Sequence, residues 1–221
     1  MSNLVKTNQP TIKKSLNLTS ALKAQAKQKL QPEAEILYLL LDGSGSMCGA
    51  KWEQLKEAVK ALYRYKGGAA IGIYEFSSDL TIHTEPTTVD MSAVIEGNSG
   101  GGTKMLLALQ VLLDQATMFT GKPFRVVLVS DGAPTDAQPK DVFFYIKNLE
   151  LKPIIDTVFI SAEGSYYYTE GEQLLRDIAQ ETGGLFFTTK QLKDLSTIFI
   201  SLSPEKRMIG FQGVNENNMQ R

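Results

Sequence analysis

The oxygen-bearing side chains of Asp42, Ser44 and Ser46 alternate with two glycines in the stretch ILYLLLDGSGSMCG at 36–49. In an extended turn, alternate residues can point the same way, and glycine lets the backbone turn tightly. The cluster would offer one carboxylate and two hydroxyls, all hard oxygen donors that suit Mg²⁺ better than a soft metal. A Ser/Gly-rich turn is also common as a simple helix cap, so a metal site requires further donors.

Two other stretches supply such donors. The glycine run at 100–102 ends in the hydroxyl of Thr103, just before an apolar helical pattern, and the apolar run FRVVLVS at 124–130 ends in Asp131. The runs at 36–41 and 124–130 are typical of strands buried on both faces of a parallel sheet. Ligands of open α/β sheets bind at the carboxyl ends of the strands, so we expect all these donors to meet at one edge of the sheet.

These five positions, together with the stretch LRDIAQETGGLFF at 175–187, make the chain resemble the von Willebrand factor A family over roughly residues 33–202. They match the metal-ion-dependent adhesion site of that family one for one. The resemblance implies that Ser44, Ser46 and Thr103 ligate Mg²⁺ (or Mn²⁺) through their hydroxyls, while Asp42 and Asp131 act largely through waters. It also implies that a Glu or Asp carboxylate of a partner protein completes the coordination, without chemical turnover.

Length and composition indicate one globular domain. The chain has 221 residues, 43% of them hydrophobic, which is enough to bury a full core. A single cysteine, Cys48, excludes an internal disulfide framework and favours a reducing compartment. The sequence has neither an apolar run long enough to span a bilayer nor the apolar region of a secretory signal at its N-terminus. We therefore expect a cytoplasmic protein with no membrane partner.

Charge is distributed unevenly along the chain. Residues 1–32 contain six lysines and no acidic residue, and the other residues include 17 basic and 24 acidic ones. We interpret 1–32 as a basic N-terminal arm, partly helical or disordered and dispensable for the fold. Residues 33–202 would form the domain, and 203–221 a polar C-terminal tail that frays. No arginine or aromatic residue accompanies the lysines of the arm, so we do not expect a nucleic-acid partner.

Strand and helix patterns alternate along the predicted domain. Besides the two buried runs, strands are expected at 70–76, 80–83, 154–160 and 185–187. Helices are expected from 51 to the glycines at 67–68, and at 104–119, 140–149, 172–182 and 192–202. This alternation predicts an α/β fold with a doubly wound, mostly parallel sheet, one short antiparallel edge strand and helices on both faces.

Enzymatic interpretations of the 42–51 stretch are weaker. A phosphate-binding loop requires four residues between its glycines and a hydroxyl after its lysine; here three residues separate the glycines at 45 and 49, and Trp52 follows Lys51. Asp42 as a phosphoryl-accepting nucleophile would call for a second carboxylate two residues on, where Ser44 stands. A Mg²⁺-dependent phosphoester hydrolase stays open as a minor alternative.

Four further features have purely structural interpretations, which we weigh beside functional ones. His83, the only histidine, is expected at the surface of an edge strand, far from the metal loop, so no general base is expected beside a Ser or Cys nucleophile. Cys48 is expected to be a small packing residue, and Trp52 a packing residue on a helix face. The tyrosines at 166–168 follow a strand end, and they could equally bind a partner or cover the sheet.

We therefore expect a non-enzymatic module for Mg²⁺-dependent protein recognition, with no small-molecule substrate. Its partner would dock on the rim formed by the loops at 43–49, 97–103, 131–138 and 163–171. A scaffold that binds through another face is the main alternative. An adaptor of an AAA+ ATPase or of a tellurite-resistance-type stress system would be such a scaffold, since both use this domain.

Overall fold

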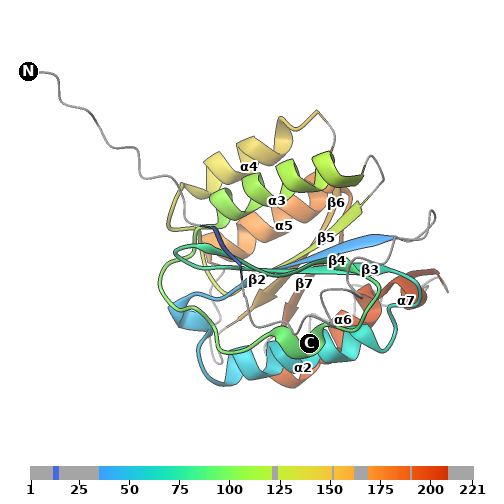
Figure 1. Ribbon diagram of the computed structural model, residues 1–221. Helices are drawn as coiled ribbons and strands as arrows, with labels where there is room; N and C mark the ends of the chain where they lie inside the picture. The colour runs from blue at the N-terminus through green and yellow to red at the C-terminus, as the bar shows by residue number, and fades with distance from the viewer. Residues whose placement is uncertain are drawn as a thin grey trace, which may run out of the picture.

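The computed structural model describes residues 12–14, 35–120, 124–150, 152–161, 169–189 and 191–208. Within these ranges the strands form one seven-stranded sheet in the order β1-β4-β3-β2-β5-β6-β7 (Figure 1). The strands are β1 (Ile12–Lys14), β2 (Ile36–Asp42), β3 (Ala70–Phe76), β4 (Leu80–Thr87), β5 (Phe124–Ser130), β6 (Ile154–Ile160) and β7 (Phe186–Thr189). The α-helices are α2 (Ala50–Tyr63), α3 (Met105–Thr120), α4 (Pro139–Lys147), α5 (Glu170–Thr182), α6 (Leu195–Leu202) and α7 (Pro204–Met208), and short 3-10 turns lie at 45–47, 92–94 and 192–194.

The sheet is mostly parallel, which confirms the predicted fold class. Strand β2 pairs in parallel with both β3 and β5, and β6 and β7 continue the parallel order. Among the described strands, the antiparallel pair is β3 with β4. Strand β4 is twice as long as the four-residue strand predicted at 80–83, because β-branched residues such as Thr84 and Thr87 continue the extended pattern past His83.

A segment of the N-terminal arm also joins the sheet. Ile12–Lys14 form β1, which pairs in parallel with Leu80–Ile82 of β4. No strand was predicted before residue 33. Because β1 pairs with the outer side of β4, β4 is not the edge strand of the described sheet. The other residues of the predicted arm, 1–11 and 15–32, lie outside the described residues.

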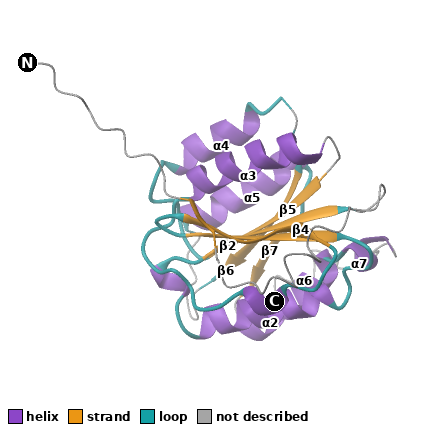
Figure 2. Cartoon of the chain, in the orientation of Figure 1, coloured by secondary structure: helices purple, strands orange, loops and turns teal. Residues whose placement is uncertain are grey.

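Alternating side chains of the strands divide the core into two layers. On β2, the side chains of Ile36, Tyr38 and Leu40 pack in one buried cluster with residues of α3, α4 and α5. The intervening Leu37, Leu39 and Leu41 pack in the other, with residues of α2 and α6. Figure 2 shows the two groups of helices on opposite faces of the sheet. Every residue of β2 is buried, as its unbroken apolar run predicted.

The described domain extends beyond the predicted boundary at 202. Pro204 begins α7, where its missing N–H costs no helical hydrogen bond. Ser203 is fully buried, and the Glu205 N–H donates to the carbonyl of Tyr65 at 3.3 Å. The residues directly after 202 are therefore docked on the domain and do not fray as predicted.

The strand order defines where a ligand would bind. From β2 the chain proceeds to β3 and β4 on one side of the sheet, and then returns to form β5 on the other side of β2. This reversal opens a crevice beyond the carboxyl ends of β2 and β5, the usual binding place in open α/β sheets. Asp42 ends β2, and Asp131 follows β5.

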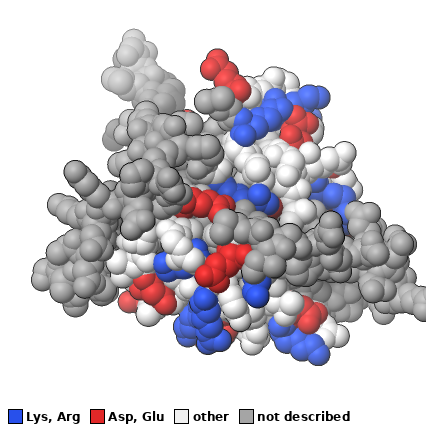
Figure 3. All heavy atoms as spheres, turned by 90° about the vertical axis from the view of Figure 1, so that its right-hand side faces the viewer, with Lys and Arg blue, Asp and Glu red and all other residues white. Residues whose placement is uncertain are grey.

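Two further properties of the described residues concern the hydropathy of the helices and the charge on one face. Among the described residues, no helix is both long enough and apolar enough to cross a membrane. Figure 3 shows the side of the molecule at the right of Figure 1, where basic and acidic groups alternate over the described part. That part of this face offers no continuous basic field of the kind that binds nucleic acid.

Candidate metal centre

Asp42 is buried at the end of β2, and hydrogen bonds fix its carboxylate. Its exposed fraction is 0%, and its Oδ1 accepts the N–H of Ser44 at 2.8 Å. Its Oδ2 accepts the hydroxyl of Ser130 at the end of β5. This contact follows from the register of the sheet, which pairs Leu41 with Val129 and so places the next residues, Asp42 and Ser130, side by side. Neutral donors thus orient the carboxylate from two strands.

Three of the predicted site residues are in direct contact. The hydroxyl oxygens of Ser44 and Ser46 lie 3.1 Å apart, and the Ser46 hydroxyl donates to Asp131 Oδ1 at 2.7 Å. Ser44 is buried and Ser46 is exposed, so the cluster lies at the boundary between core and solvent. Asp131 comes from a loop 85 residues away from Ser46, so the fold creates this cluster and local sequence alone does not.

The glycine run before Thr103 is joined to the Asp42 loop by its backbone. The Gly100 N–H donates to the carbonyl of Gly43 at 2.9 Å, and the Gly45 N–H donates to the carbonyl of Gly101 at 3.0 Å. Gly100 and Gly101 have φ angles of 69° and 88°, in the region that favours glycine. The loop that carries Thr103 therefore runs directly beside the loop that carries the two serines.

Thr103 itself is buried and joined to a third loop. Its N–H donates to the hydroxyl of Thr135 at 2.9 Å, and its carbonyl accepts the N–H of Thr135 at 2.9 Å. The loops after β2, before α3 and after β5 are thus mutually hydrogen-bonded. Four of the five predicted residues form a hydrogen-bonded chain in the order Asp42, Ser44, Ser46 and Asp131. The fifth, Thr103, lies on the adjoining loop.

His83 corrects an expectation from the sequence. It was predicted to be a surface residue far from the metal loop, but it is buried, and its Nε2 lies 2.8 Å from Oε2 of Glu75. The other oxygen of Glu75 accepts the N–H of Ser99 at 2.6 Å, in the loop before Thr103. A Cβ added to Gly43 would lie 2.0 Å from that oxygen, so Glu75 fits only because residue 43 has no side chain. Glu75 thus joins His83 to the loops that carry the candidate ligands.

The side chain of Asn98 also forms hydrogen bonds between these loops. Its amide donates to the carbonyls of Ser44 and Gly43 at 3.0 and 3.3 Å. It also donates to Sγ of Cys48 at 3.2 Å. Cys48 is exposed rather than packed, contrary to the prediction, because the 3-10 turn at 45–47 directs Met47 into the core and leaves residue 48 outside. Trp52 is buried as predicted, and its indole N–H donates to the carbonyl of Glu96 at 2.8 Å.

The buried carboxylate of Asp42 accepts hydrogen bonds from neutral groups, with no cation among its described donors. Burial raises the pKa of Asp42 above its ordinary value of 3.8, and the neighbouring charge of Asp131 raises it further. The hydrogen bonds from Ser130 and Ser44 oppose this rise. Asp131 is compensated differently, because the ammonium of Lys51 at the start of α2 contacts its Oδ2. The site therefore contains two carboxylates and one lysine.

The donors fit a small hard cation. Neighbouring ligands of an octahedral Mg²⁺ at 2.0–2.1 Å are separated by roughly 2.9 Å. The separation of 3.1 Å between the Ser44 and Ser46 hydroxyls is close to that value. Within the described ranges, no group of three or more His, Cys, Asp or Glu side chains is placed to hold a metal. Any ion bound here would depend on hydroxyl oxygens and on only two carboxylates, which is a donor set for Mg²⁺ or Mn²⁺ rather than for a soft metal.

Several residues that contact the candidate ligands or hold their loops were absent from the prediction. Ser130 and Lys51 contact the predicted aspartates, and Glu75 and Asn98 hold the loops. The position of Ser130 directly before Asp131 was a usable signal, because the strand end that carries one aspartate adjoins the strand end that carries the other. The tyrosines at 166–168 lie outside the described residues.

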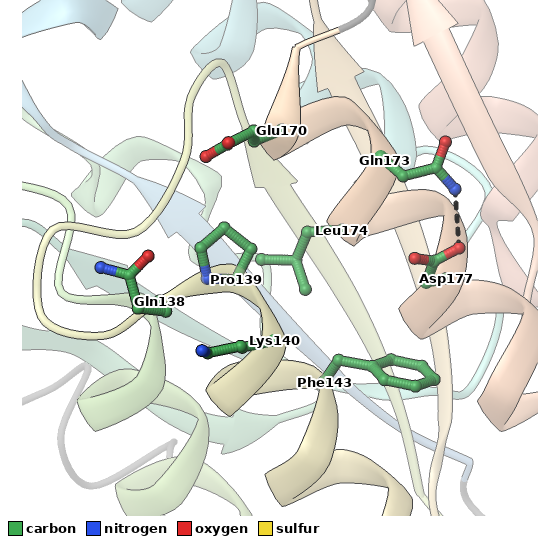
Figure 4. Close-up of a pocket in the computed structure, with 8 residues that line it drawn as sticks. All are labelled: Gln138, Pro139, Lys140, Phe143, Glu170, Gln173, Leu174 and Asp177. Atoms are coloured by element: carbon green, nitrogen blue, oxygen red, sulfur yellow. Dashed lines mark hydrogen bonds between the residues drawn. The ribbon is translucent and has the colours of Figure 1, made fainter.

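A separate hollow lies between α4 and α5, and Gln138, at the end of the loop after β5, is part of its lining (Figure 4). It has a volume of about 430 Å³, and Phe143 and Leu174 supply its apolar wall. Gln173 donates to Asp177 at 2.8 Å along its α5 side. Phe144, the next residue of α4, is 67% exposed. The polar and charged lining side chains are Gln138, Lys140, Glu170, Gln173 and Asp177.

A doubly wound sheet with oxygen donors at its central strand ends defines a class of α/β domain, and comparisons with known proteins show which domains it resembles. A family model described as the von Willebrand factor type A domain matches residues 37–133, the segment that contains all five predicted site residues. Compared with curated proteins, the chain has no significant match. The chain is thus similar to the von Willebrand factor type A domain over the segment from β2 to the residues just after β5, which is less than half of its length.

Solved structures share the fold at low sequence identity. A von Willebrand factor type A protein from Catenulispora acidiphila has a TM-score of 0.64 and 17% identity, over 76% of this chain and 42% of that chain. The ArnB paralog VWA2 from Sulfolobus acidocaldarius has a TM-score of 0.58 and 22% identity, over 78% of this chain and 46% of that chain. The VWA domain of SpRpn10 has a TM-score of 0.56 and 16% identity, over 82% and 99%. This chain thus spans less than half of the first two structures.

Proposed function

We propose that this domain recognises a partner protein by binding a Mg²⁺ or Mn²⁺ ion whose open coordination position accepts an Asp or Glu carboxylate of the partner. Domains of this family commonly mediate protein–protein interaction, which supports the general class. The observation that carries the metal-dependent part is the contact of Ser44, Ser46 and Asp131, which come from two loops and meet at the sheet's crevice.

The chemistry of the donors explains why a carboxylate would be the preferred ligand. Neutral hydroxyl ligands leave a bound divalent ion electron-poor, while Asp42 and Asp131 balance its charge without surrounding it. Mg²⁺ requires six oxygens in near-octahedral geometry, so positions not filled by the chain stay with water or a partner oxygen. An anionic oxygen is the strongest candidate for such a position.

The arrangement also supports recognition without turnover. The only histidine in the sequence, His83, contacts Glu75, whereas the hydroxyls of Ser44 and Ser46 contact each other and Asp131, so His83 is not placed to take a proton from either serine. A phosphoester hydrolase that used histidine as its general acid or base is not supported by this placement. A phosphatase assay with Mg²⁺ tests that alternative directly, and measurable turnover abolished by Asp42→Ala would favour it.

Isothermal titration of the metal-stripped protein with MnCl₂ and MgCl₂ tests the metal site. We expect one site in the wild type and no measurable binding in Asp131→Asn. The matched control is Asp136→Asn, which makes the same charge change in the same loop, where the carboxylate accepts the N–H groups of Leu106 and Leu107 instead. Equal metal affinity in the Asp131 and Asp136 variants would show that the cluster does not bind the ion.

Capture of partners in Mg²⁺ against EDTA tests the recognition step. Proteins retained by the wild type in Mg²⁺ should be released by EDTA and lost with Thr103→Ala. The control is Ser99→Ala, which removes an exposed hydroxyl from the same loop. A partner retained equally by the Thr103 variant and in EDTA would contradict metal-mediated docking.

A second candidate function is a scaffold that binds through another face. Two observations favour it: the hollow between α4 and α5, and the exposed Phe144 on α4. Aromatic residues at a surface are enriched in interfaces. Binding through that face would be insensitive to EDTA, which separates it from the proposed function.

A further inference from the structure

Lys51 reaches from the first turn of α2 to the candidate metal site. Its ammonium contacts Oδ2 of Asp131, 80 residues further along the chain, while Oδ1 of that carboxylate accepts the hydroxyl of Ser46. The Asp131 side chain is only 3% exposed, and that of Lys51 is 24% exposed. One oxygen of Asp131 is thus used by a predicted metal ligand and the other by a positive charge of the protein itself.

The position of Lys51 has no local explanation. The first turn of a helix carries the positive end of the helix dipole, where a cation is disfavoured and an acidic residue is stabilised. Other lysines of α2 pair on the helix surface, Lys56 with Glu53 and Lys60 with Glu57. Lys51 instead pairs across the fold with the carboxylate of the β5 loop, which explains its tolerance at this position.

The contact supplies part of the charge that a divalent ion would supply. A buried carboxylate is costly unless a cation or several hydrogen bonds compensate it. Asp131 receives that compensation from Lys51, whereas Asp42, in the same cluster, receives only neutral donors. The two carboxylates therefore differ in how much they would gain from a bound ion.

We propose that Lys51 is a tethered cation that competes with the divalent ion for Asp131 and so weakens the metal affinity of the site. The inference rests on the proposed metal-binding function and adds a residue that regulates it. An ion bound beside Asp131 would either displace the ammonium from the carboxylate or repel it at close range. For a divalent ion and a monovalent group a few ångströms apart at a protein surface, this repulsion lowers the affinity by about tenfold or more.

Titration of metal-stripped variants with MnCl₂ tests the proposal. Lys51→Met should bind the ion about tenfold more tightly than the wild type, whereas Lys51→Arg, which keeps the charge, should stay within about twofold. Lys56→Met is the matched control, because it removes the same charge from the same helix at a surface pair, and its affinity should match the wild type. Lys51→Gln provides a second variant in case the Met variant does not fold, since an amide can still donate to Asp131.

Thermal unfolding gives a second readout. Without metal, Lys51→Met should melt below the wild type, because it leaves Asp131 without its cation. With saturating Mn²⁺ the difference should shrink or reverse, so the metal-induced rise in Tm should be larger in the variant than in the wild type.

The outcomes distinguish the inference from the proposed function. If the wild type binds Mn²⁺ and the charge-removing variants bind it equally or more weakly, Lys51 does not compete, and only the inference is overturned. If neither the wild type nor any variant binds Mn²⁺, the metal site and the inference both fail. Binding by Lys51→Met but not by the wild type would support the inference in its strongest form, with lysine as the dominant occupant.

Discussion

Two aspartates lie fully buried in this sheet, Asp42 at the carboxyl end of β2 and Asp156 near the amino end of β6, and they are compensated in different ways. Asp156 on β6 contacts two nitrogens of the Arg125 guanidinium and accepts the N–H of Leu185 at 2.8 Å. Asp42 at the end of β2 receives only a hydroxyl and a backbone N–H, and a second carboxylate raises its pKa further. Both residues have an exposed fraction of 0%.

The difference separates a structural charge from a candidate functional one. A buried carboxylate that a guanidinium binds through two nitrogens has its charge balanced within the chain, so it needs no ligand. A buried carboxylate with neutral donors and an anionic neighbour is left short of positive charge. Asp42 is in that condition at the crevice where ligands of open α/β sheets bind. The comparison thus supports a cation site at the rim without reference to any relative.

Removing the cation of the balanced pair should have the largest effect. Arg125→Met leaves Asp156 buried without its partner, and we expect the free energy of unfolding to fall by about 3–5 kcal/mol in urea denaturation. The matched control is Lys152→Met. Its pair with Glu181 is 31% and 25% exposed, so solvent screens it and the loss there should be much smaller. Similar losses in the two variants would mean that burial does not distinguish these pairs.

Replacing Gly43 by alanine should cost less but should damage the rim specifically. The new Cβ would lie 2.0 Å from Oε1 of Glu75, which must move and release the N–H of Ser99. We expect a loss of about 2 kcal/mol from overpacking, measured in urea, together with weaker Mn²⁺ binding. Gly132→Ala is the control, because a Cβ there meets no atom within 4 Å and should leave stability unchanged. A fully stable Gly43 variant would show that Glu75 adapts freely.

The strand and helix order could be predicted from the sequence because it depends on local periodicity. The buried runs at 36–41 and 124–130 and the residues that follow them identified the fold and the aspartates of the rim. The contacts of Ser130 and Lys51 could not be predicted from local periodicity. The Ser130 contact depends on the register between strands, and the Lys51 contact joins residues that are 80 positions apart in the sequence. His83 was misplaced because its partner, Glu75, belongs to a strand that otherwise reads as uniformly apolar core.

Replacing Asp42 by asparagine should stabilise the metal-free protein. Asparagine can still accept the Ser44 N–H and donate to Ser130, while the uncompensated charge is removed. We expect a gain of about 1 kcal/mol in metal-free urea denaturation, at the low end of what relief of a buried charge provides, together with loss of Mn²⁺ binding. Asp156→Asn is the control, and it should destabilise the protein because Arg125 loses its anion. A loss of stability in both variants would show that the two aspartates do the same structural work.

The stabilities of the wild type and of Asp42→Asn should also depend differently on pH. Because the pKa of Asp42 is raised in the folded state, the folded protein holds this proton more tightly than the unfolded chain. The resulting stabilisation is present below the ordinary value of 3.8 and is lost as pH rises through the raised folded value. The advantage of Asp42→Asn over the wild type should therefore grow from pH 4 towards pH 7 in metal-free buffer. An advantage that does not change with pH would contradict this assignment of the charge.

The smallest effect is expected at the exposed aromatic of α4. Phe144 is 67% exposed, so Phe144→Ser removes little buried surface and should change the free energy of unfolding by no more than about 0.5 kcal/mol. The informative measurement for this variant is how much partner it captures. If the rim binds the partner through a metal, Phe144→Ser should retain the partner in Mg²⁺ as the wild type does, and Asp131→Asn should lose it. If α4 and α5 form the docking face, the pattern reverses, because truncating an interfacial aromatic anchor typically costs about 2 kcal/mol or more. Since both variants should remain folded, the comparison assigns the interaction to one end of the sheet or to its helical face.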